Sequence, residues 1–178
     1  MRKKYLLVLC AGLLLASTAA LTSCDKGSDE PVPGLEWQEG GYQYVEPCLQ
    51  WGASTSQVKN WMESNTKEFK LMSDIPDGML MYNRNSPSTQ LQYIFGIGHP
   101  GLMDVTITYN SIEGFQDVKS KTEKSYNCKL LQNPDNPEHY EAEGVIINGK
   151  KTCIDIIVKK IPQFPTSGIV TIKYSLED

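Results

Sequence analysis

Two histidines are the residues of this chain best suited to acid–base chemistry or metal binding. His99 lies in the segment GHPG (98–101), between two strand-like segments, and His139 lies in a proline-containing loop before Tyr140. A metal site or a catalytic triad needs further ligands or partners at defined spacing, and neither histidine has them nearby in the sequence. We therefore interpret both histidines as loop residues, and we predict no metal and no cofactor.

Other catalytic motifs are missing from the sequence. There is no serine-centred nucleophile elbow, and the segment GIG (96–98) is not followed by the helix start that phosphate binding requires. Carboxylates are plentiful, so a pair of the glycosidase type stays open, although the sequence alone does not single out its residues. We predict that the protein is not an enzyme.

Aromatic residues crowd into one short region and form a candidate recognition site. Trp37, Tyr42, Tyr44 and Trp51 lie close in sequence, together with two glycines at 40–41. Exposed rings can form a flat apolar platform for sugar rings or for a partner protein. The competing interpretation is a core role, because Tyr42 and Tyr44 alternate as in a strand and Trp51 can pin a helix to the sheet.

The first 23 residues have the layout of a secretory signal peptide. Three basic residues (2–4) precede an apolar run (5–15) that is shorter than the roughly 20 residues of a membrane span. The following LTSC (21–24) resembles the bacterial lipobox. That resemblance implies a diacylglycerol on Cys24, cleavage before it, and acylation of the new amino terminus, including palmitate. The alternative is an ordinary signal peptide with an incidental cysteine, or an uncut anchor.

The charge of the mature chain is negative. Removal of the signal takes three of the 17 basic residues and leaves 14 against 21 acidic ones, so the net charge falls from −4 to −7. The absence of a basic patch argues against a nucleic-acid partner. We expect contact with a membrane only through the lipid anchor.

Residues 24–36 read as an acidic, flexible tether (CDKGSDEPVPGLE). The acidic run after Cys24 resembles the signal by which Bacteroidota lipoproteins reach the outer face of the outer membrane. In enterobacteria, an Asp at the position of Asp25 instead favours retention in the inner membrane. We expect an outer-membrane lipoprotein facing the exterior, with the periplasmic face as the alternative. A plain solvated spacer is the simpler interpretation.

Residues 37–178 have the length of a single domain, and we expect them to form one. Cys48, Cys128 and Cys153 remain after Cys24 is lipidated, which allows at most one disulfide and leaves one thiol free. Their spacing matches no zinc motif, and burial as free cysteine is expected for at least one of them.

A similar order of elements occurs twice in this domain, in residues 46–110 and 111–178. A capping box at Ser54 and Gln57 predicts one helix, and Ser111 is the expected cap of a second. Alternating strand-like segments follow each helix, and they include VTITY (105–109) and VTIKY (170–174). The pair Asn148-Gly149 predicts a tight hairpin.

These patterns predict an α+β fold of two tandem repeats, each a helix plus antiparallel strands, that share one sheet with both helices on one face. The competing interpretation is a single domain whose strands look alike because Val, Ile, Thr and Tyr suit every sheet. In the two-repeat fold, the sheet face opposite the helices is expected to be open and polar. Its predicted residues are Thr106, Thr108, Thr171, Lys173 and Ser175.

Two resemblances bear on function. The element order resembles the β-lactamase inhibitor proteins and the small outer-membrane assembly lipoproteins of similar shape. The segment EPCLQWGAS (46–54), followed by QVKNWM, resembles a block of short uncharacterised Bacteroidota lipoproteins. Neither resemblance assigns a functional residue. We predict a non-enzymatic module that binds a protein through its open face; the alternative is a glycan-binding lipoprotein that uses Trp37, Tyr42 and Tyr44.

Overall fold

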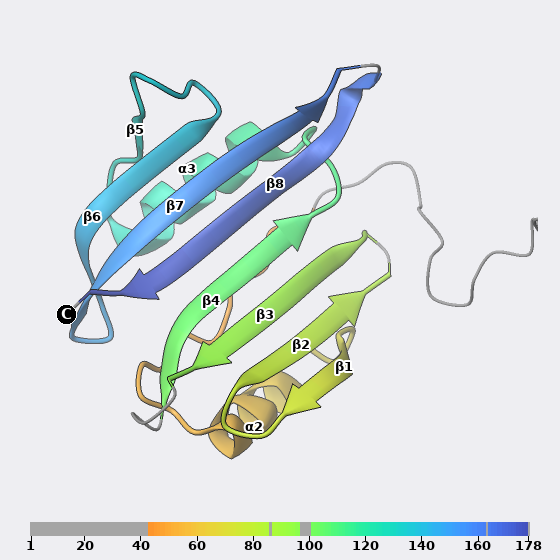
Figure 1. The fold of residues 1–178 in the computed structure, drawn as a ribbon, viewed down its shortest axis with the longest axis vertical. Helices are drawn as coiled ribbons and strands as arrows, with labels where there is room; N and C mark the ends of the chain where they lie inside the picture. The colour runs from red at the N-terminus through yellow and green to blue at the C-terminus, as the bar shows by residue number, and fades with distance from the viewer. Residues whose placement is uncertain (1–42, 86, 97–100, 163, 178) are drawn as a thin grey trace, which may run out of the picture. The chain divides into compact units, whose positions relative to one another are not determined.

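The computed structural model describes residues 43–85, 87–96, 101–162 and 164–177. Most of this part of the chain forms one antiparallel sheet with the strand order β1-β2-β3-β4-β8-β7-β6-β5 (Figure 1). The strands are β1 (Lys70–Ile75), β2 (Met79–Arg84), β3 (Thr89–Phe95), β4 (Leu102–Tyr109), β5 (Leu131–Gln132), β6 (His139–Ile147), β7 (Lys150–Ile161) and β8 (Phe164–Leu176).

The first helix, α2 (Thr55–Asn65), begins as its sequence predicts. The Ser54 hydroxyl accepts a hydrogen bond from the Gln57 amide, and the Gln57 side chain accepts one from the Ser54 amide. This reciprocal arrangement satisfies two amides that a helix start leaves without partners. The predicted capping box is therefore confirmed.

The second helix, α3 (Phe115–Tyr126), begins without a side-chain cap. Its N-cap residue is Gly114, and the hydroxyl of Ser111 instead accepts a hydrogen bond from the Glu113 amide at 3.2 Å. The expectation that Ser111 caps this helix is wrong, because the helix starts four residues after it. The helix ends at Asn127, which adopts the left-handed conformation with φ of 47°.

Both helices pack on the same face of the sheet, as Figure 1 shows. Val58 and Met62 of α2 and Val118 of α3 are almost wholly buried and belong to one hydrophobic cluster. The strands supply every second residue to it, as their alternating burial requires. One continuous row of buried strand residues crosses five strands: Leu80, Tyr93, Val105, Tyr174 and Ile154.

The predicted α+β class is wrong, because the fold is dominated by its sheet. Strands make up 48% and helices only 18% of the described chain, and the two helices have 11 and 12 residues. The strands of the second half are long, with 12 residues in β7 and 13 in β8, so most backbone groups are satisfied by strand pairing. We describe the molecule as one eight-stranded sheet with two short helices, each of which precedes four strands in the chain.

The two similar pentapeptides lie next to each other at the centre of this sheet. Strands β4 and β8 pair antiparallel, with Val105 opposite Tyr174 and Ile107 opposite Ile172. Both strands bury Val, Ile and Tyr on one face and expose Thr on the other, so both need β-branched and aromatic residues at alternate positions. Shared strand chemistry on a common buried face accounts for their likeness.

The hairpin between β6 and β7 has the predicted tight turn. Asn148 and Gly149 both have positive φ, 50° and 78°, as the favoured two-residue turn requires. A bulge between Ala142 and Val145 then shifts the register of β6 against β7, and Gly144 there also has positive φ, 65°. Residues 139–142 of β6 are therefore displaced by one position against β7, relative to the register that residues 145–147 set.

Candidate functional site

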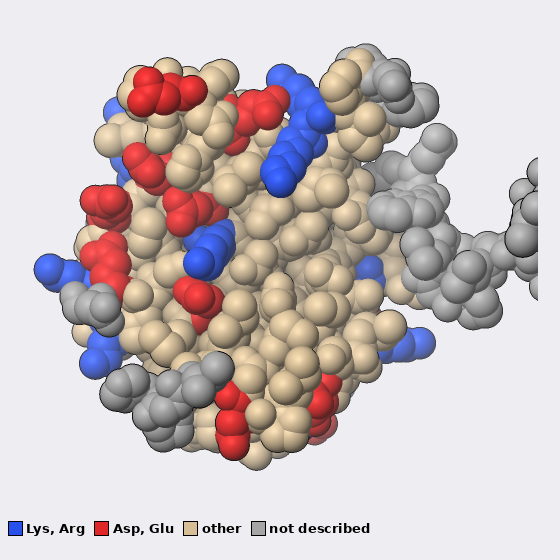
Figure 2. All heavy atoms as spheres, viewed as in Figure 1, with Lys and Arg blue, Asp and Glu red and all other residues tan. Residues whose placement is uncertain are grey.

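We call the sheet face opposite the two helices the open face; it is the face turned toward the reader in Figures 1 and 2. Four of the predicted binding residues lie together at its centre. Thr106 and Thr108 on β4 are directly opposite Lys173 and Thr171 on β8. The three threonines are half-buried and Lys173 is exposed. Ser175, the fifth predicted residue, lies on the same face opposite Asp104.

The part of the open face over β2 and β3 carries no charge at its described positions. Its side chains are those of six residues that alternate with the buried set: Met79, Met81, Asn83, Gln90, Gln92 and Ile94. The amides are held by their neighbours, since Gln90 Nε2 lies 3.3 Å from Asn83 Oδ1 and Gln92 Nε2 lies 2.8 Å from Met79 Sδ. We call these six residues the neutral patch.

The other half of the open face is charged. Acidic and basic side chains gather over β5 to β8 in Figure 2, whereas the area over β2 to β4 is almost free of them. At the middle of the sheet, where β8 pairs with β4, Lys173 Nζ lies 3.7 Å from Asp104 Oδ1. The open face is therefore divided along the middle of the sheet.

The predicted aromatic platform is described only in part. Cys24, Trp37 and Tyr42 lie outside the described residues. Tyr44 is half-buried and its hydroxyl is wholly buried, while Lys121 Nζ lies 5.9 Å from the centre of its ring. Trp51 is half-buried and packs against the hydrophobic core. Within the described chain, these two aromatic residues serve packing and do not form an exposed platform.

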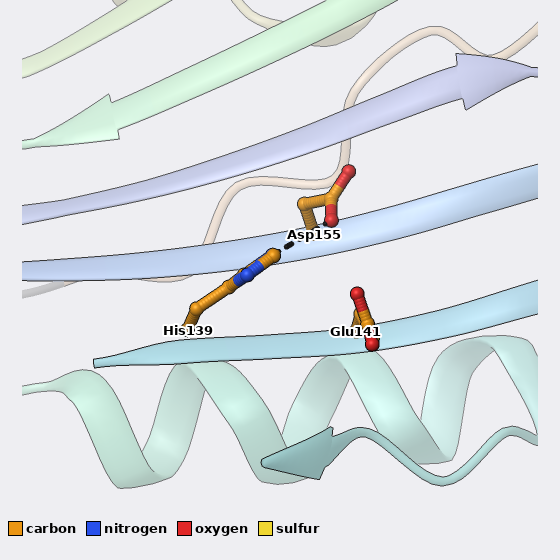
Figure 3. A group of neighbouring side chains, drawn as sticks. All are labelled: His139, Glu141 and Asp155. Atoms are coloured by element: carbon orange, nitrogen blue, oxygen red, sulfur yellow. Dashed lines mark hydrogen bonds and ion pairs between the residues drawn. The ribbon is translucent and has the colours of Figure 1, made fainter. Parts of the chain in front are cut away.

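A cluster of three titratable side chains lies in the charged half of the open face (Figure 3). His139 and Glu141 come from β6, and Asp155 comes from β7. His139 Nε2 lies 2.9 Å from Asp155 Oδ1, and the donor atoms of all three residues lie within 4.8 Å of one another. All three side chains are half-buried. We call them the His–Glu–Asp cluster.

Strand register brings this cluster together. Glu141 is directly opposite Asp155, and His139 is opposite Ile157, so His139 and Asp155 are diagonal neighbours. Residues 139 and 141 share a face because side chains alternate along a strand. Without the bulge, Glu141 would lie opposite a buried isoleucine, Ile156, since the turn pairs Ile147 with Lys150. The bulge therefore places these side chains on the open face.

Two carboxylates directly opposite each other repel. Asp155 is contacted by His139 through one oxygen and by Cys153 through the other, at 3.6 Å from the thiol sulfur. Lys173 is opposite Asp155 in the register, but its ammonium group is paired with Asp104. Among the described residues, no hydrogen bond or ion pair reaches the Glu141 carboxylate. The Glu141 carboxylate therefore has no bonded partner in the part of the chain that the structure describes.

The pKa of the neighbouring Cys153 thiol is raised by burial and in part by the negative charges of this region. Burial raises the pKa of its thiol, and the charges of Asp155, Glu177 and Glu143 raise it further, to about 11. The thiol is therefore protonated at neutral pH and donates to Asp155. Cys48, Cys128 and Cys153 are all free thiols, with Cys48 buried. The expected burial of a free cysteine is confirmed.

Glu141 and Asp155 do not stand out in the sequence, and His139 was interpreted as a loop residue, whereas it is the first residue of β6. The alternation in HYE and CID was visible, but it does not show which residues face each other across a hairpin. Gly144 inside a strand-like segment was the available signal of a bulge. That signal does not reveal the direction of the register shift.

Comparison of the chain with models of known protein families, with curated proteins and with solved structures finds no match. Neither of the two described helices is long and apolar enough to cross a membrane.

Proposed function

We propose that this protein is a lipid-anchored module of the cell envelope that binds a protein partner through the open face of its sheet. The anchor is Cys24 of the lipobox-like segment LTSC, and the acidic residues 24–36 serve as its tether. Stable anchoring follows if the cysteine carries a diacylglycerol and an amide-linked acyl chain, because two or more chains hold a protein at a membrane. The proposed location is the outer membrane, with the domain facing the exterior.

The observation that carries the proposed binding role is the neutral patch over β2 and β3. The cores of protein–protein interfaces are depleted of charged residues and enriched in methionine, and the neutral patch has both properties. The threonines of β4 extend it toward the middle of the sheet. A partner that covers this area desolvates no charge on these strands, which lowers the cost of association.

A charged rim accompanies the neutral patch. Asp104 and Lys173 lie at its border, and the His–Glu–Asp cluster lies beyond them. Charged groups around an interface guide the encounter and fix the orientation of the partner more than they add affinity. The open face thus offers an uncharged area over β2 and β3 with charged groups to one side of it.

Photo-crosslinking in the source cells tests the binding face. A photoreactive residue at Gln92, in the neutral patch, is compared with one at Gln116, an exposed glutamine on α3. We expect a discrete adduct of constant mass from Gln92 alone, and we expect Met81→Lys to abolish it. Equal adducts from both positions, or none from Gln92 at native expression, would contradict the proposed binding face.

The anchor has a separate test. We expect the wild-type chain to incorporate labelled palmitate and to sediment with membranes, and Cys24→Ala to lose the label, to retain the uncleaved amino terminus and to leave the outer membrane. Surface proteolysis of intact cells then distinguishes the exterior face from the periplasmic one. Palmitate incorporation that survives Cys24→Ala would remove the assigned attachment site.

A further inference from the structure

We propose that the His–Glu–Asp cluster binds one divalent transition-metal ion of the zinc type, with His139, Glu141 and Asp155 as its protein ligands. The donor set is one imidazole nitrogen and two carboxylate oxygens, drawn from neighbouring strands β6 and β7 (Figure 3). Imidazole favours zinc and related metals, whereas calcium and magnesium prefer sites made of oxygen alone. Three protein ligands leave a further coordination position for water.

The geometry needs only a small adjustment to hold such an ion. Two ligand atoms at zinc-bonding distance, about 2.0–2.1 Å each, lie roughly 3.3 Å apart in a tetrahedral site. His139 Nε2 and Asp155 Oδ1 are 2.9 Å apart, and the third ligand lies within 4.8 Å of both. Side-chain rotations of all three residues bring them to this spacing while their strands stay paired. Sites on paired strands are also positioned more rigidly than sites on loops.

The electrostatic balance of the cluster favours a bound cation. Glu141 and Asp155 are opposite each other, and no hydrogen bond or ion pair from another described residue reaches the Glu141 carboxylate. Lys173, the ammonium group nearest in the register, is engaged by Asp104. A divalent ion between the two carboxylates would remove their repulsion and would give the Glu141 carboxylate a partner.

The surroundings also orient one of the ligands. The Cys153 thiol donates to the Asp155 oxygen that faces away from His139, so the other oxygen stays directed at the cluster. Groups of this kind, bonded to a ligand and not to the metal, commonly fix ligand orientation. The assignment is a three-ligand site in which Cys153 supports Asp155.

Metal titration of the full chain tests this site. The protein is purified from membranes in detergent, stripped with a chelator, and titrated with Zn²⁺ by calorimetry and with Co²⁺ by visible absorption. We expect one ion per chain and the intense visible bands of tetrahedral cobalt. We expect His139→Gln and Glu141→Gln each to weaken binding by about ten-fold or more, as loss of a ligand does at least as strongly as loss of a supporting group.

Two matched controls separate this site from weak surface binding. His99→Gln removes the other histidine, and Glu138→Gln removes a carboxylate three residues from Glu141. We expect both controls to keep the affinity of the wild type. Zinc should also shift the ring resonances of His139 and leave those of His99 unchanged in a spectrum that resolves both histidines.

The competing interpretation is a plain ion pair between protonated His139 and Asp155. In that case His139→Gln would lower the stability of the fold while zinc and cobalt bound no better to the wild type than to the variant. Binding that His99→Gln or Glu138→Gln weakened as much as the ligand variants would overturn the site equally.

Discussion

The half of the sheet formed by β1 to β4 and the half formed by β5 to β8 bury polar side chains in different ways. In the first half, under α2, the fully buried Tyr93 places its hydroxyl 3.3 Å from the Cys48 amide and 3.1 Å from Met62 Sδ. In the second half, under α3, the equally buried Tyr174 has a hydroxyl without a hydrogen-bond partner. The two tyrosines belong to one core row, with Val105 between them, and they have opposite hydrogen-bonding environments.

A second buried polar group of the first half is also satisfied. Arg84, only 3% exposed, is bonded to Gln43, Pro87 and Thr89 and faces Glu68 at 3.6 Å. Around Tyr174, the buried hydroxyls of Tyr44, Thr122 and Tyr126 approach one another, but none has the geometry of a hydrogen bond. The Tyr93 hydroxyl and the Arg84 guanidinium thus have partners, whereas the four hydroxyls around Tyr174, like Trp51 Nε1, have none among the described residues.

A buried hydroxyl without a partner costs about 1–3 kcal/mol relative to the same group in water. We infer that the second half gains its stability from apolar packing and from strand pairing along β7 and β8. Variants of corresponding residues, one in each half, test this inference.

The largest effects are expected from truncation of the apolar core, and they should be equal in the two halves. Leu80 and Ile154 are both 0% exposed and belong to the same buried row. We expect Leu80→Ala and Ile154→Ala each to lower the free energy of unfolding by about 2–5 kcal/mol, because each leaves a cavity. Urea unfolding should show a single transition in both variants. Two separate transitions would show that the halves do not share one cooperative core.

The next effect concerns the satisfied polar group of the first half. We expect Arg84→Met to cost about 2–3 kcal/mol, because it removes the charged donor that bonds to the carbonyls of Gln43 and Pro87 and to the buried Thr89 hydroxyl. Glu68 is 49% exposed at its side chain, so Glu68→Gln should cost less than about 1 kcal/mol. Chemical denaturation of both variants measures the difference. An equal loss from both would mean that Arg84 acts mainly through its ion pair.

Removal of single hydroxyls should give effects of opposite sign in the two halves. Tyr93→Phe should destabilise by about 1 kcal/mol, because it leaves the buried Cys48 amide without an acceptor. Tyr174→Phe should be neutral or stabilising, because it removes an unsatisfied group without creating a cavity. The denaturant midpoints of the two variants, compared with that of the wild type, measure both effects. A clear loss of stability in Tyr174→Phe would show that the four hydroxyls are satisfied, for example by an internal water.

The smallest effect distinguishes how the two helices end. After α2, the Thr66 hydroxyl bonds to the Met62 carbonyl and carries no charge. In the last turn of α3, the Glu123 carboxylate accepts hydrogen bonds from the Leu130 amide at 2.9 Å and from Lys119 at 2.6 Å. Burial opposes ionisation of Glu123, but these hydrogen bonds and nearby Lys129 outweigh it and hold its pKa below the ordinary 4.5.

A carboxylate with a lowered pKa stabilises the folded state fully above its unfolded-state pKa, and it loses this contribution as the pH falls through its folded-state pKa. Glu123→Gln should therefore cost roughly 0.5–1 kcal/mol at pH 7 and nothing once wild-type Glu123 is protonated. Thr66→Val should show a pH-independent loss. Thermal denaturation between neutral and strongly acidic pH measures both. A cost of Glu123→Gln that stays constant with pH would contradict the assignment.

Local features of the fold were predictable from short stretches of sequence. The capping box at Ser54 and Gln57 and the turn at Asn148-Gly149 follow from contacts within four residues, and both are confirmed. The alternation in residues 105–109 and 170–174 likewise indicated which side chains are buried. The predicted start of α3 was wrong, because the Ser111 hydroxyl accepts a hydrogen bond from the Glu113 amide before the helix begins.

The fold class and the cluster could not be predicted in the same way. The balance between helix and sheet depends on how far strands such as β7 and β8 extend by pairing with each other, which is a long-range property. The likeness of two pentapeptides suggested repeated units, yet the same pattern serves two strands that pair with each other. Propensity alone does not separate these cases.

Local properties follow from the sequence: where the first helix starts, where a hairpin turns, which face of a strand is apolar, and the presence of the lipobox-like segment LTSC (21–24). Which residues meet across strands depends on the folded chain. A single bulge beside Gly144 moves Glu141 from a position opposite Ile156 to one opposite Asp155. The physical reason is the two-residue period of a strand, in which a shift of one residue exchanges the buried and the open face.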